Sequence, residues 1–449
     1  MLLWALLAVW NPFDGFRPSL CVVGDVDGDG VSDVLVCARE SFEAEAVWLL
    51  SGADGECIRV LESPREGSKF GRAMCAMGDL DRDGVPDFAI SGNEYESGRV
   101  VETPRELSYP REDGRYLCDG RGRARERGYV RVYSGASGEV LFEIVSEQQG
   151  DGFGSVLAGG LDVDRDGVPD LVVGNPPLLV LVYSGAAGHP IRSLEPPFRH
   201  GRAIEAAWVW PRGLRLVPDV DESGGVDILV SGEERELLWG PDGGLGFQPY
   251  GEVTEHIALF SGAEGELLWE RSEELGWYEG AGWQMDVLED LDGDGSAELL
   301  VAAVDDSVRI VSLASGREVR RHSYSGGYMH AEGTTAGAIG DLDRDGVGDY
   351  AIAANETWDD DPGFVRVHSG RTGEELWLRG NHHPGRWLKP GQRPTPSDDM
   401  QDDGLDFCAP GDLDGDGTPD LIVLYRKQRR TVAVSGKDWA TDLWQFVAE

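Results

Sequence analysis

The chain carries an acidic nine-residue pattern whose carboxylates stand two residues apart. The copy that begins at Asp79 reads DLDRDGVPD, with carboxylates at positions 1, 3, 5 and 9 and a glycine at position 6. Copies begin at Asp25, Asp79, Asp162, Asp219, Asp290, Asp341 and Asp412. Carboxylates this close repel one another unless a cation lies between them. The pattern therefore indicates a cation site in each repeat.

The chemistry expected of this pattern is that of a hard cation with oxygen ligands. Side chains at positions 1, 3, 5 and 9 would converge with the main-chain carbonyl of position 7, and the glycine permits a sharp turn, as is typical of Ca²⁺ loops. Mg²⁺ fits less well because it retains more water ligands. Acidic turns without a metal are the alternative. The predicted ligands are Asp25, Asp27, Asp29, Val31, Asp33, Asp79, Asp81, Asp83, Val85, Asp87, Asp162, Asp164, Asp166, Val168, Asp170, Asp219, Asp221, Ser223, Asp227, Asp290, Asp292, Asp294, Ser296, Glu298, Asp341, Asp343, Asp345, Val347, Asp349, Asp412, Asp414, Asp416, Thr418 and Asp420.

Two copies depart from the pattern. The fourth reads DVDESGGVD, with Ser223 at position 5, and the fifth has Glu298 instead of aspartate at position 9. We therefore expect six strong Ca²⁺ sites and a seventh, degenerate one. The loops are not EF-hands, because position 12 is apolar (Ile90 in the second copy) and the flanking segments resemble strands rather than helices.

Short strands are expected to position these loops. One strand, such as RAMCAMGD, enters the loop, and a second with alternating apolar residues, such as DFAIS, leaves it. A third strand ends in a glycine-containing hairpin turn, as in VYSGASGE, and a fourth, such as EVLFEI, follows. Seven such units predict an all-β, seven-bladed β-propeller with four antiparallel strands per blade and calcium loops between the first two strands. A linear array of separate β-modules is the alternative.

We expect one propeller over residues 16–449. Residues 1–15 are interpreted as a signal remnant or a closing strand. MLLWALLAVW lacks the basic n-region and the cleavage motif of a full signal peptide, and its LLW recurs at 267–269 in a predicted strand. The predicted blades span residues 16–69, 70–150, 151–199, 200–276, 277–327, 328–380 and 381–449.

Long connections are expected on one rim of the propeller. The calcium loops and the hairpin turns share a rim, whereas the insertions 93–128, 195–210, 232–256 and 380–406 fall on the opposite one. Long loops on a rigid scaffold often carry function, so this face is predicted to bind a partner. The run at 121–128 is basic and is either a solvated tip or a clamp for an anionic partner. Aromatic candidates either bind the partner or pack the loops. The candidate contacts are Tyr109, Tyr116, Trp277, Tyr278, Trp358, His382, His383 and Trp387.

Charge and cysteine usage narrow the functional classes. The formal net charge is −42, which argues against nucleic-acid binding. No apolar run reaches the length of a membrane span, and we expect a monomer that is extracellular or at the cell surface. Cys21, Cys75 and Cys408 stand at one position of the loop-entering strand, where adjacent blades should hold them too far apart to bridge. They are interpreted as small buried residues, with a channel-lining metal cluster as the alternative.

The repeats resemble a known family. Phe-Gly at 70–71 and 153–154, the D-x-D-x-D-G-x-x-D loops and the Gly-Asn-Pro-Pro stretch at 174–177 are similar to FG-GAP repeats. Those repeats form the seven-bladed propeller of the integrin α-subunit N-terminal region and of related bacterial secreted proteins. The resemblance covers about residues 12–449 and implies a calcium-stabilised propeller for extracellular adhesion or recognition. It does not extend to integrin stalk domains, an inserted adhesion domain or a membrane segment.

Two functional classes remain open. The sequence contains no G-x-S-x-G, H-E-x-x-H or phosphate-binding motif, so no catalytic constellation is identified. The leading hypothesis is a binding or adhesion module that recognises a protein or polysaccharide. The alternative is a secreted, calcium-dependent enzyme acting on polysaccharide or lipid, with a site on the insertion face.

Overall fold

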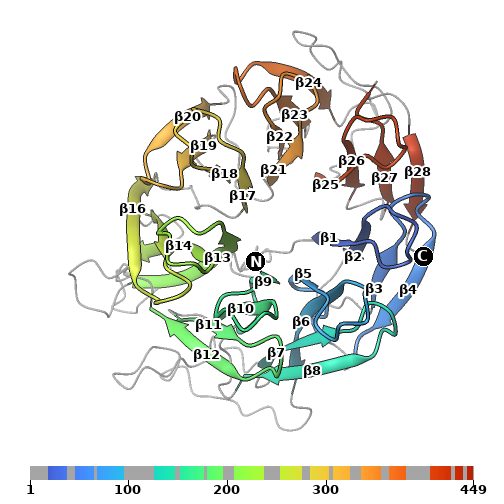
Figure 1. The fold of residues 1–449 in the computed structure, drawn as a ribbon, viewed down its shortest axis with the longest axis vertical. Coiled ribbons are helices and arrows are strands. Elements are labelled where there is room, and N and C mark those ends of the chain that lie inside the picture. The colour runs from blue at the N-terminus through green and yellow to red at the C-terminus, as the bar shows by residue number, and fades with distance from the viewer. Residues whose placement is uncertain are drawn as a thin grey trace, which may run out of the picture.

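The computed structural model shows a closed ring of seven four-stranded antiparallel sheets (Figure 1). It describes residues 19–37, 46–64, 68–95, 126–146, 152–175, 179–195, 207–236, 253–275, 284–302, 307–323, 335–354, 364–380, 405–425, 430–437 and 442–447. Each sheet uses four strands that are consecutive in the sequence. The predicted all-β, seven-bladed architecture is therefore confirmed, and the linear array is excluded.

The strands of the first four blades are short, except for the middle strands of blade 2 and the strands of blade 4. Their bounds are β1 Ser19–Gly24, β2 Asp33–Cys37, β3 Ala46–Leu50, β4 Cys57–Glu62, β5 Met74–Gly78, β6 Asp87–Tyr95, β7 Glu126–Tyr133, β8 Val140–Val145, β9 Leu157–Leu161, β10 Asp170–Asn175, β11 Leu179–Tyr183, β12 Pro190–Leu194, β13 Ala207–Val217, β14 Asp227–Glu236, β15 Val253–Phe260 and β16 Leu267–Leu275.

The remaining three blades have the same strand order. Their bounds are β17 Gln284–Leu288, β18 Glu298–Ala302, β19 Ser307–Ser312, β20 Glu318–Ser323, β21 Thr335–Gly340, β22 Asp349–Ala354, β23 Phe364–His368, β24 Glu375–Gly380, β25 Leu405–Gly411, β26 Asp420–Tyr425, β27 Arg430–Val434 and β28 Asp442–Val447. Within the described residues, no helix is long and apolar enough to cross a membrane.

Three predicted insertions are shorter than expected. In blade 2, β6 and β7 stay paired out to Tyr95 opposite Glu126, and in blade 4, β14 and β15 stay paired out to Arg235 opposite Val253. The predicted connection 195–210 also ends early, because β13 begins at Ala207. A ladder satisfies backbone N–H and C=O groups whatever the side chains are. The hydrophobic alternation that marks a strand therefore ends before the pairing does.

The core lies between blades. Phe70 precedes the first strand of blade 2, yet it packs in one buried cluster with Cys37 and Val47 of blade 1 and with Tyr133 of blade 2. Phe153 lies in the same way between blades 2 and 3. The phenylalanine of the Phe-Gly element thus packs between adjacent sheets.

Among the described strands none is shared between blades 7 and 1, which contact each other by side-chain packing; residues 1–15, the predicted signal remnant or closing strand, lie outside the described residues. The innermost strands β1 and β25 are in contact. Trp444 of β28 is buried in a cluster with Val34 and Leu50 of blade 1. Its indole Nε1 donates a 2.8 Å hydrogen bond to the carbonyl of Gly52. Trp269 of β16 makes the equivalent bond to Leu313 at the boundary of blades 4 and 5, 2.7 Å long.

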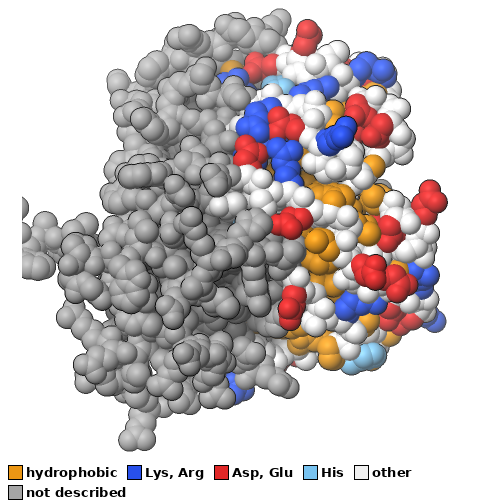
Figure 2. Space-filling view, turned by 90° about the vertical axis from the view of Figure 1, so that its left-hand side faces the viewer, with side chains coloured by type: hydrophobic (Ala, Val, Ile, Leu, Met, Phe, Trp, Pro, Cys, Tyr) orange, Lys and Arg blue, Asp and Glu red, His pale blue; other side chains and the backbone are white. Residues whose placement is uncertain are grey.

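Charged groups also join blades 4 and 5. Arg309 of β19 is 1% exposed and pairs with Glu255 of β15, and a 3.0 Å contact links it to Glu273 of β16. Arg321 of β20 pairs with Glu273 at 3.2 Å. Figure 2 views the outer wall on this side, where acidic and basic side chains are interspersed among hydrophobic ones. Both signs of charge therefore occur together on this wall.

Candidate metal centres

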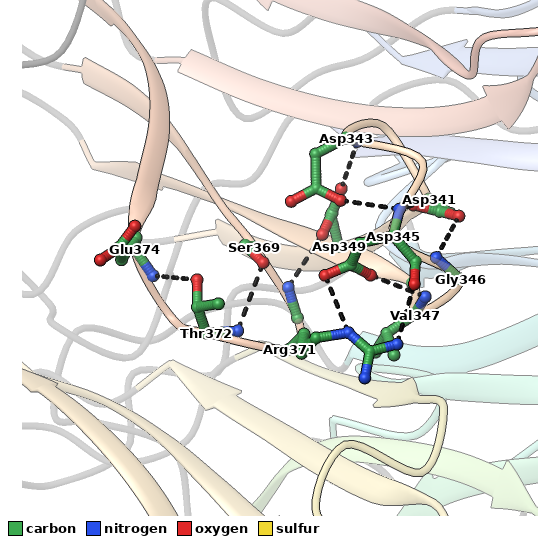
Figure 3. A network of polar contacts seen from close by, with 12 residues as sticks. Asp341, Asp343, Asp345, Gly346, Val347, Asp349, Ser369, Arg371, Thr372 and Glu374 are labelled. Atoms are coloured by element: carbon green, nitrogen blue, oxygen red, sulfur yellow. Dashed lines mark hydrogen bonds and ion pairs between the residues drawn. The ribbon is translucent and has the colours of Figure 1, made fainter.

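The acidic loop of blade 6 shows how the nine residues are held (Figure 3). Asp341, at position 1, accepts hydrogen bonds from the amides of Asp345 and Gly346 at 3.0 and 2.9 Å. Asp345, at position 5, accepts one from Val347 at 2.9 Å. The early carboxylates thus turn toward the inside of the loop. The same hydrogen bonds recur around Asp79 in blade 2 and Asp412 in blade 7.

The carboxylate at position 9 joins the acidic loop to the hairpin turn that follows the third strand. In blade 6, Asp349 Oδ2 accepts the amide of Leu342 at 2.7 Å, and Oδ1 accepts the amide of Gly370 at 2.8 Å. Asp349 is 0% exposed. Five other blades repeat the bond to the turn glycine. These pairs are Asp33–Gly52, Asp87–Gly135, Asp170–Gly185, Asp227–Gly262 and Asp420–Gly436. The prediction that loops and turns share a rim is therefore confirmed.

This contact explains the first glycine of the turn motif, which sequence analysis did not interpret. A Cβ built at Gly370 would overlap the carbonyl oxygen of Gly348, at position 8 of the loop. A Cβ at Gly185 would overlap the carbonyl of Pro169 in the same way. Only glycine lets the turn approach the loop so closely. The recurrence of Ser-Gly in six copies was the available sequence signal.

Burial disfavours the ionised form of the carboxylates at position 9. Burial is the largest cause that raises the pKa of Asp33 and of Asp170 to about 6, and backbone hydrogen bonds only partly oppose it. Burial also raises the pKa of Glu298 to about 7, and Asp290, Asp292 and Asp294 add to the shift by charge repulsion. A bound cation would favour the ionised forms.

Most of the carboxylates predicted as ligands in blades 1 to 5 come together in space, but the groups do not include Asp33, Asp83 and Asp166. In blades 1 to 5, carboxylates of one loop each offer an oxygen within 4.8 Å of the others. The groups are Asp25, Asp27 and Asp29; Asp79, Asp81 and Asp87; Asp162, Asp164 and Asp170; Asp219, Asp221 and Asp227; and Asp290, Asp292, Asp294 and Glu298. Glu298, a member of the last group, has a buried oxygen, Oε1, that accepts no hydrogen bond from the described residues. An all-oxygen donor set of this kind fits a hard divalent cation.

Blade 4 retains a group despite Ser223. The amide of Ser223 donates to Asp221 Oδ1 and to Asp219 Oδ1, both at 2.9 Å, as the position 5 amide does in other loops. Asp219, Asp221 and Asp227 still converge, so the serine does not disperse the carboxylates.

Basic residues reach two of the loops. Arg371, directly after the turn glycine of blade 6, places Nε 3.1 Å from Asp345 Oδ2. Lys437 of blade 7 places Nζ 3.3 Å from Asp416. Ala53, Ala136, Ala186 and Ala263 occupy this position in blades 1 to 4. These two loops therefore carry part of their counter-charge within the chain, which sequence analysis missed.

The predicted partner contacts lie outside the described residues. They are Tyr109, Tyr116, Trp277, Tyr278, Trp358, His382, His383 and Trp387. The strand ends that join the long connections can be placed. Because each blade is antiparallel, the ends β6–β7, β14–β15 and β24–β25 lie on the rim opposite the acidic loops.

The position that Cys21, Cys75 and Cys408 occupy in the innermost strands is held by other residue types in other blades. Cys21 and Cys75 form no disulfide. Cys75 is buried, whereas Cys21 and Cys408 are partly exposed, so the expectation of burial holds fully for Cys75. Counting four residues back from each acidic loop, Arg215 and Asp286 occupy the same position in blades 4 and 5.

Comparisons with known proteins agree with this geometry. The FG-GAP repeat family matches residues 153–187. Mouse integrin alpha-7 is 31% identical over 176 residues, which cover 36% of this chain and 12% of that protein. Human integrin alpha-8 is 28% identical over 173 residues, covering 34% and 14%. Drosophila integrin alpha-PS2 is 29% identical over 175 residues, covering 33% and 11%. The matches thus span 11% to 14% of the length of these relatives.

Among solved structures, the fold is similar to BBS1N in a complex with ARL6DN. The TM-score is 0.50 at 11% identity, over 90% of each chain. This likeness concerns the fold alone.

Proposed function

We propose that this chain is a calcium-stabilised extracellular binding or adhesion module. It is an FG-GAP propeller that resembles the integrin α-subunit N-terminal region. The observation that carries the proposal is the recurrence of a converging carboxylate loop at the same rim in blade after blade. Repetition at every blade is expected of a scaffold element, because a catalytic centre would need to occur only once.

The cation's role in this proposal is structural. Positions 1, 3, 5 and 9 of each loop would hold Ca²⁺ together with the carbonyl of position 7, and the ion would favour the ionised forms of the buried carboxylates. Asp349 and its equivalents already tie loop to turn, so an ion beside them would fasten three strands of the blade at one rim. Binding to the folded state alone stabilises it by mass action.

The partner face is the rim opposite the acidic loops. Its support is topological, since the long connections start and end there and the acidic rim is occupied by tightly bonded loops and turns. A protein or polysaccharide is the expected partner, and the aromatic candidates named above would contact it. No observation specifically favours the enzyme alternative.

Thermal unfolding with Ca²⁺ or with EDTA tests the metal role. We expect Ca²⁺ to raise the melting temperature, and six or seven ions per chain to be counted by elemental analysis of the dialysed protein. Fewer than about three ions without a change in melting temperature would contradict the proposal.

The partner face needs a separate experiment. The chain with Tyr109→Ser and Tyr116→Ser would be compared with wild type on an immobilised panel of extracellular proteins and polysaccharides. The control carries Asp54→Ser and Glu56→Ser, two exposed positions in the blade 1 turn on the acidic rim. Loss of binding in the control but not in the tyrosine variant would contradict the proposal, because the partner would then bind the acidic rim.

A further inference from the structure

The acidic loop of blade 5 differs from the others at two positions that contact each other elsewhere in the ring. Glu298 replaces the aspartate of position 9, and Leu313 replaces the first glycine of the turn. In the other blades that glycine donates its amide to the position 9 carboxylate. Here the amide of Leu313 donates to the carbonyl of Ala297, at 3.1 Å. A residue with a Cβ cannot approach as glycine does, so the carboxylate loses its donor from the turn.

Glu298 is left with one oxygen that no described group satisfies. Its carboxylate is 0% exposed. Oε2 accepts the amide of Leu291 at 2.7 Å, whereas Oε1 is buried and accepts no hydrogen bond from the described residues. A buried carboxylate oxygen without a donor costs free energy, and such atoms are rare in folded proteins. A cation would satisfy it.

The surrounding carboxylates point to that cation. Asp290, Asp292, Asp294 and Glu298 each offer an oxygen within 4.8 Å of the others. In blades 1 to 4, three carboxylates lie within this distance; the loops of blades 1 to 3 contain a fourth, Asp33, Asp83 or Asp166, that is not in the group. The added methylene of glutamate thus accompanies a fourth carboxylate in the cluster. For Ca²⁺ loops, affinity depends on the number of charged ligands.

We propose that the blade 5 loop is the tightest divalent-cation site of the chain and that Glu298 Oε1 is a direct ligand of the ion. This inference rests on the proposed calcium role and ranks the loops within it. In blades 6 and 7, Arg371 and Lys437 already pair with the position 5 carboxylate. Those loops must release a basic side chain before the same oxygen can bind an ion, so they bind more weakly.

The test is a calorimetric titration of the full chain, stripped of metal, with Ca²⁺. The Glu298→Gln variant keeps the size of the side chain and removes its charge. The matched control is Glu62→Gln, which makes the same charge change at an exposed glutamate at the end of β4 in blade 1, away from the acidic loops. We expect the tightest step of the wild type to weaken by about tenfold or more in Glu298→Gln. The control should retain that step, and the remaining equivalents should be unchanged.

A second measurement separates loss of a ligand from loss of structure. In EDTA, Glu298→Gln should unfold at the same temperature as the wild type or higher, because it loses only an unsatisfied buried charge. A lower unfolding temperature in EDTA, or a tightest step that survives in Glu298→Gln, would overturn the assignment. If the wild type binds several Ca²⁺ but the variant titrates identically, this inference fails and the proposed function stands. If the wild type binds none, both fail.

Discussion

The carboxylate that joins loop and turn in six of the blades should stabilise them even without a metal, and Asp170→Asn in blade 3 isolates this effect. Asp170 Oδ2 accepts the amides of Val163 and Asp164 at 2.8 and 3.2 Å, and Oδ1 accepts the amide of Gly185 at 3.2 Å. Asparagine retains one oxygen, so its NH₂ group must face one of these donors.

The cost follows from the loss of one acceptor in a buried place. If the oxygen of asparagine stays with Val163, the amide of Gly185 faces an NH₂ group and remains unsatisfied. A lost hydrogen bond to a charged group costs about 1.5–3 kcal/mol, and a buried unsatisfied donor costs about 1–3 kcal/mol, with overlap between the two. Because burial raises the pKa of Asp170 to about 6, removing its charge offsets part of this cost, and we expect the free energy of unfolding to fall by about 1–3 kcal/mol. If the propeller unfolds as a unit, the melting temperature should fall by about 1–3 °C.

The assay is thermal and urea unfolding in EDTA, so that no ion contributes. The matched control is Glu298→Gln, since Glu298 Oε1 accepts no hydrogen bond from the described residues. We expect a loss in Asp170→Asn and none in the control. Equal losses in the two variants, or no loss in Asp170→Asn, would refute the reasoning that the turn glycine's bond carries the effect.

Three further predictions concern the turn, the ring closure and the buried histidines. Gly185→Ala should lower the free energy of unfolding by more than about 3 kcal/mol, because its Cβ would overlap the carbonyl of Pro169. The control Gly167→Ala has open space around its Cβ but a φ of +86°, and it should lower the free energy of unfolding by about 1–2 kcal/mol. Equal losses of the two variants in urea unfolding would contradict this. Trp444→Phe should lower the free energy of unfolding by about 1–3 kcal/mol, because the carbonyl of Gly52 loses its indole donor. It should also speed proteolysis at the junction of blades 7 and 1. Unchanged unfolding and proteolysis would show that the bond does not hold the ring closed. Burial, the largest cause, lowers the pKa of His322 and of His368 to about 4, so their neutral forms stabilise the fold above pH 6.5, and this contribution is lost as the pH falls toward 4. His368→Tyr, which copies Tyr133 and Tyr183 of blades 2 and 3, should therefore show a smaller drop in melting temperature between pH 7 and 5 than the wild type or the exposed-site control His189→Gln; an identical drop in all three would refute this.

The predicted strand ends illustrate where local patterns stop being informative. Apolar alternation located the strands of blade 2, but β6 continues to Tyr95 because backbone pairing with β7 persists beyond the core. Burial sets the alternation, whereas hydrogen bonding sets the length. A sequence pattern therefore predicts the part of a strand that is buried and underestimates the rest.

The sequence by itself determined the features that depend on near neighbours. The seven repeats, the carboxylates at positions 1, 3 and 5, and the hairpin glycines with positive φ, such as Gly55, follow from turn chemistry within a few residues. Only the tertiary structure decided which partner each buried group meets. It pairs Asp33 with Gly52, places Trp444 against blade 1, and leaves Glu298 Oε1 without a donor among the described residues. The reason is physical: turn geometry is set by local dihedral angles, whereas the satisfaction of a buried polar atom depends on groups that folding brings from distant parts of the chain.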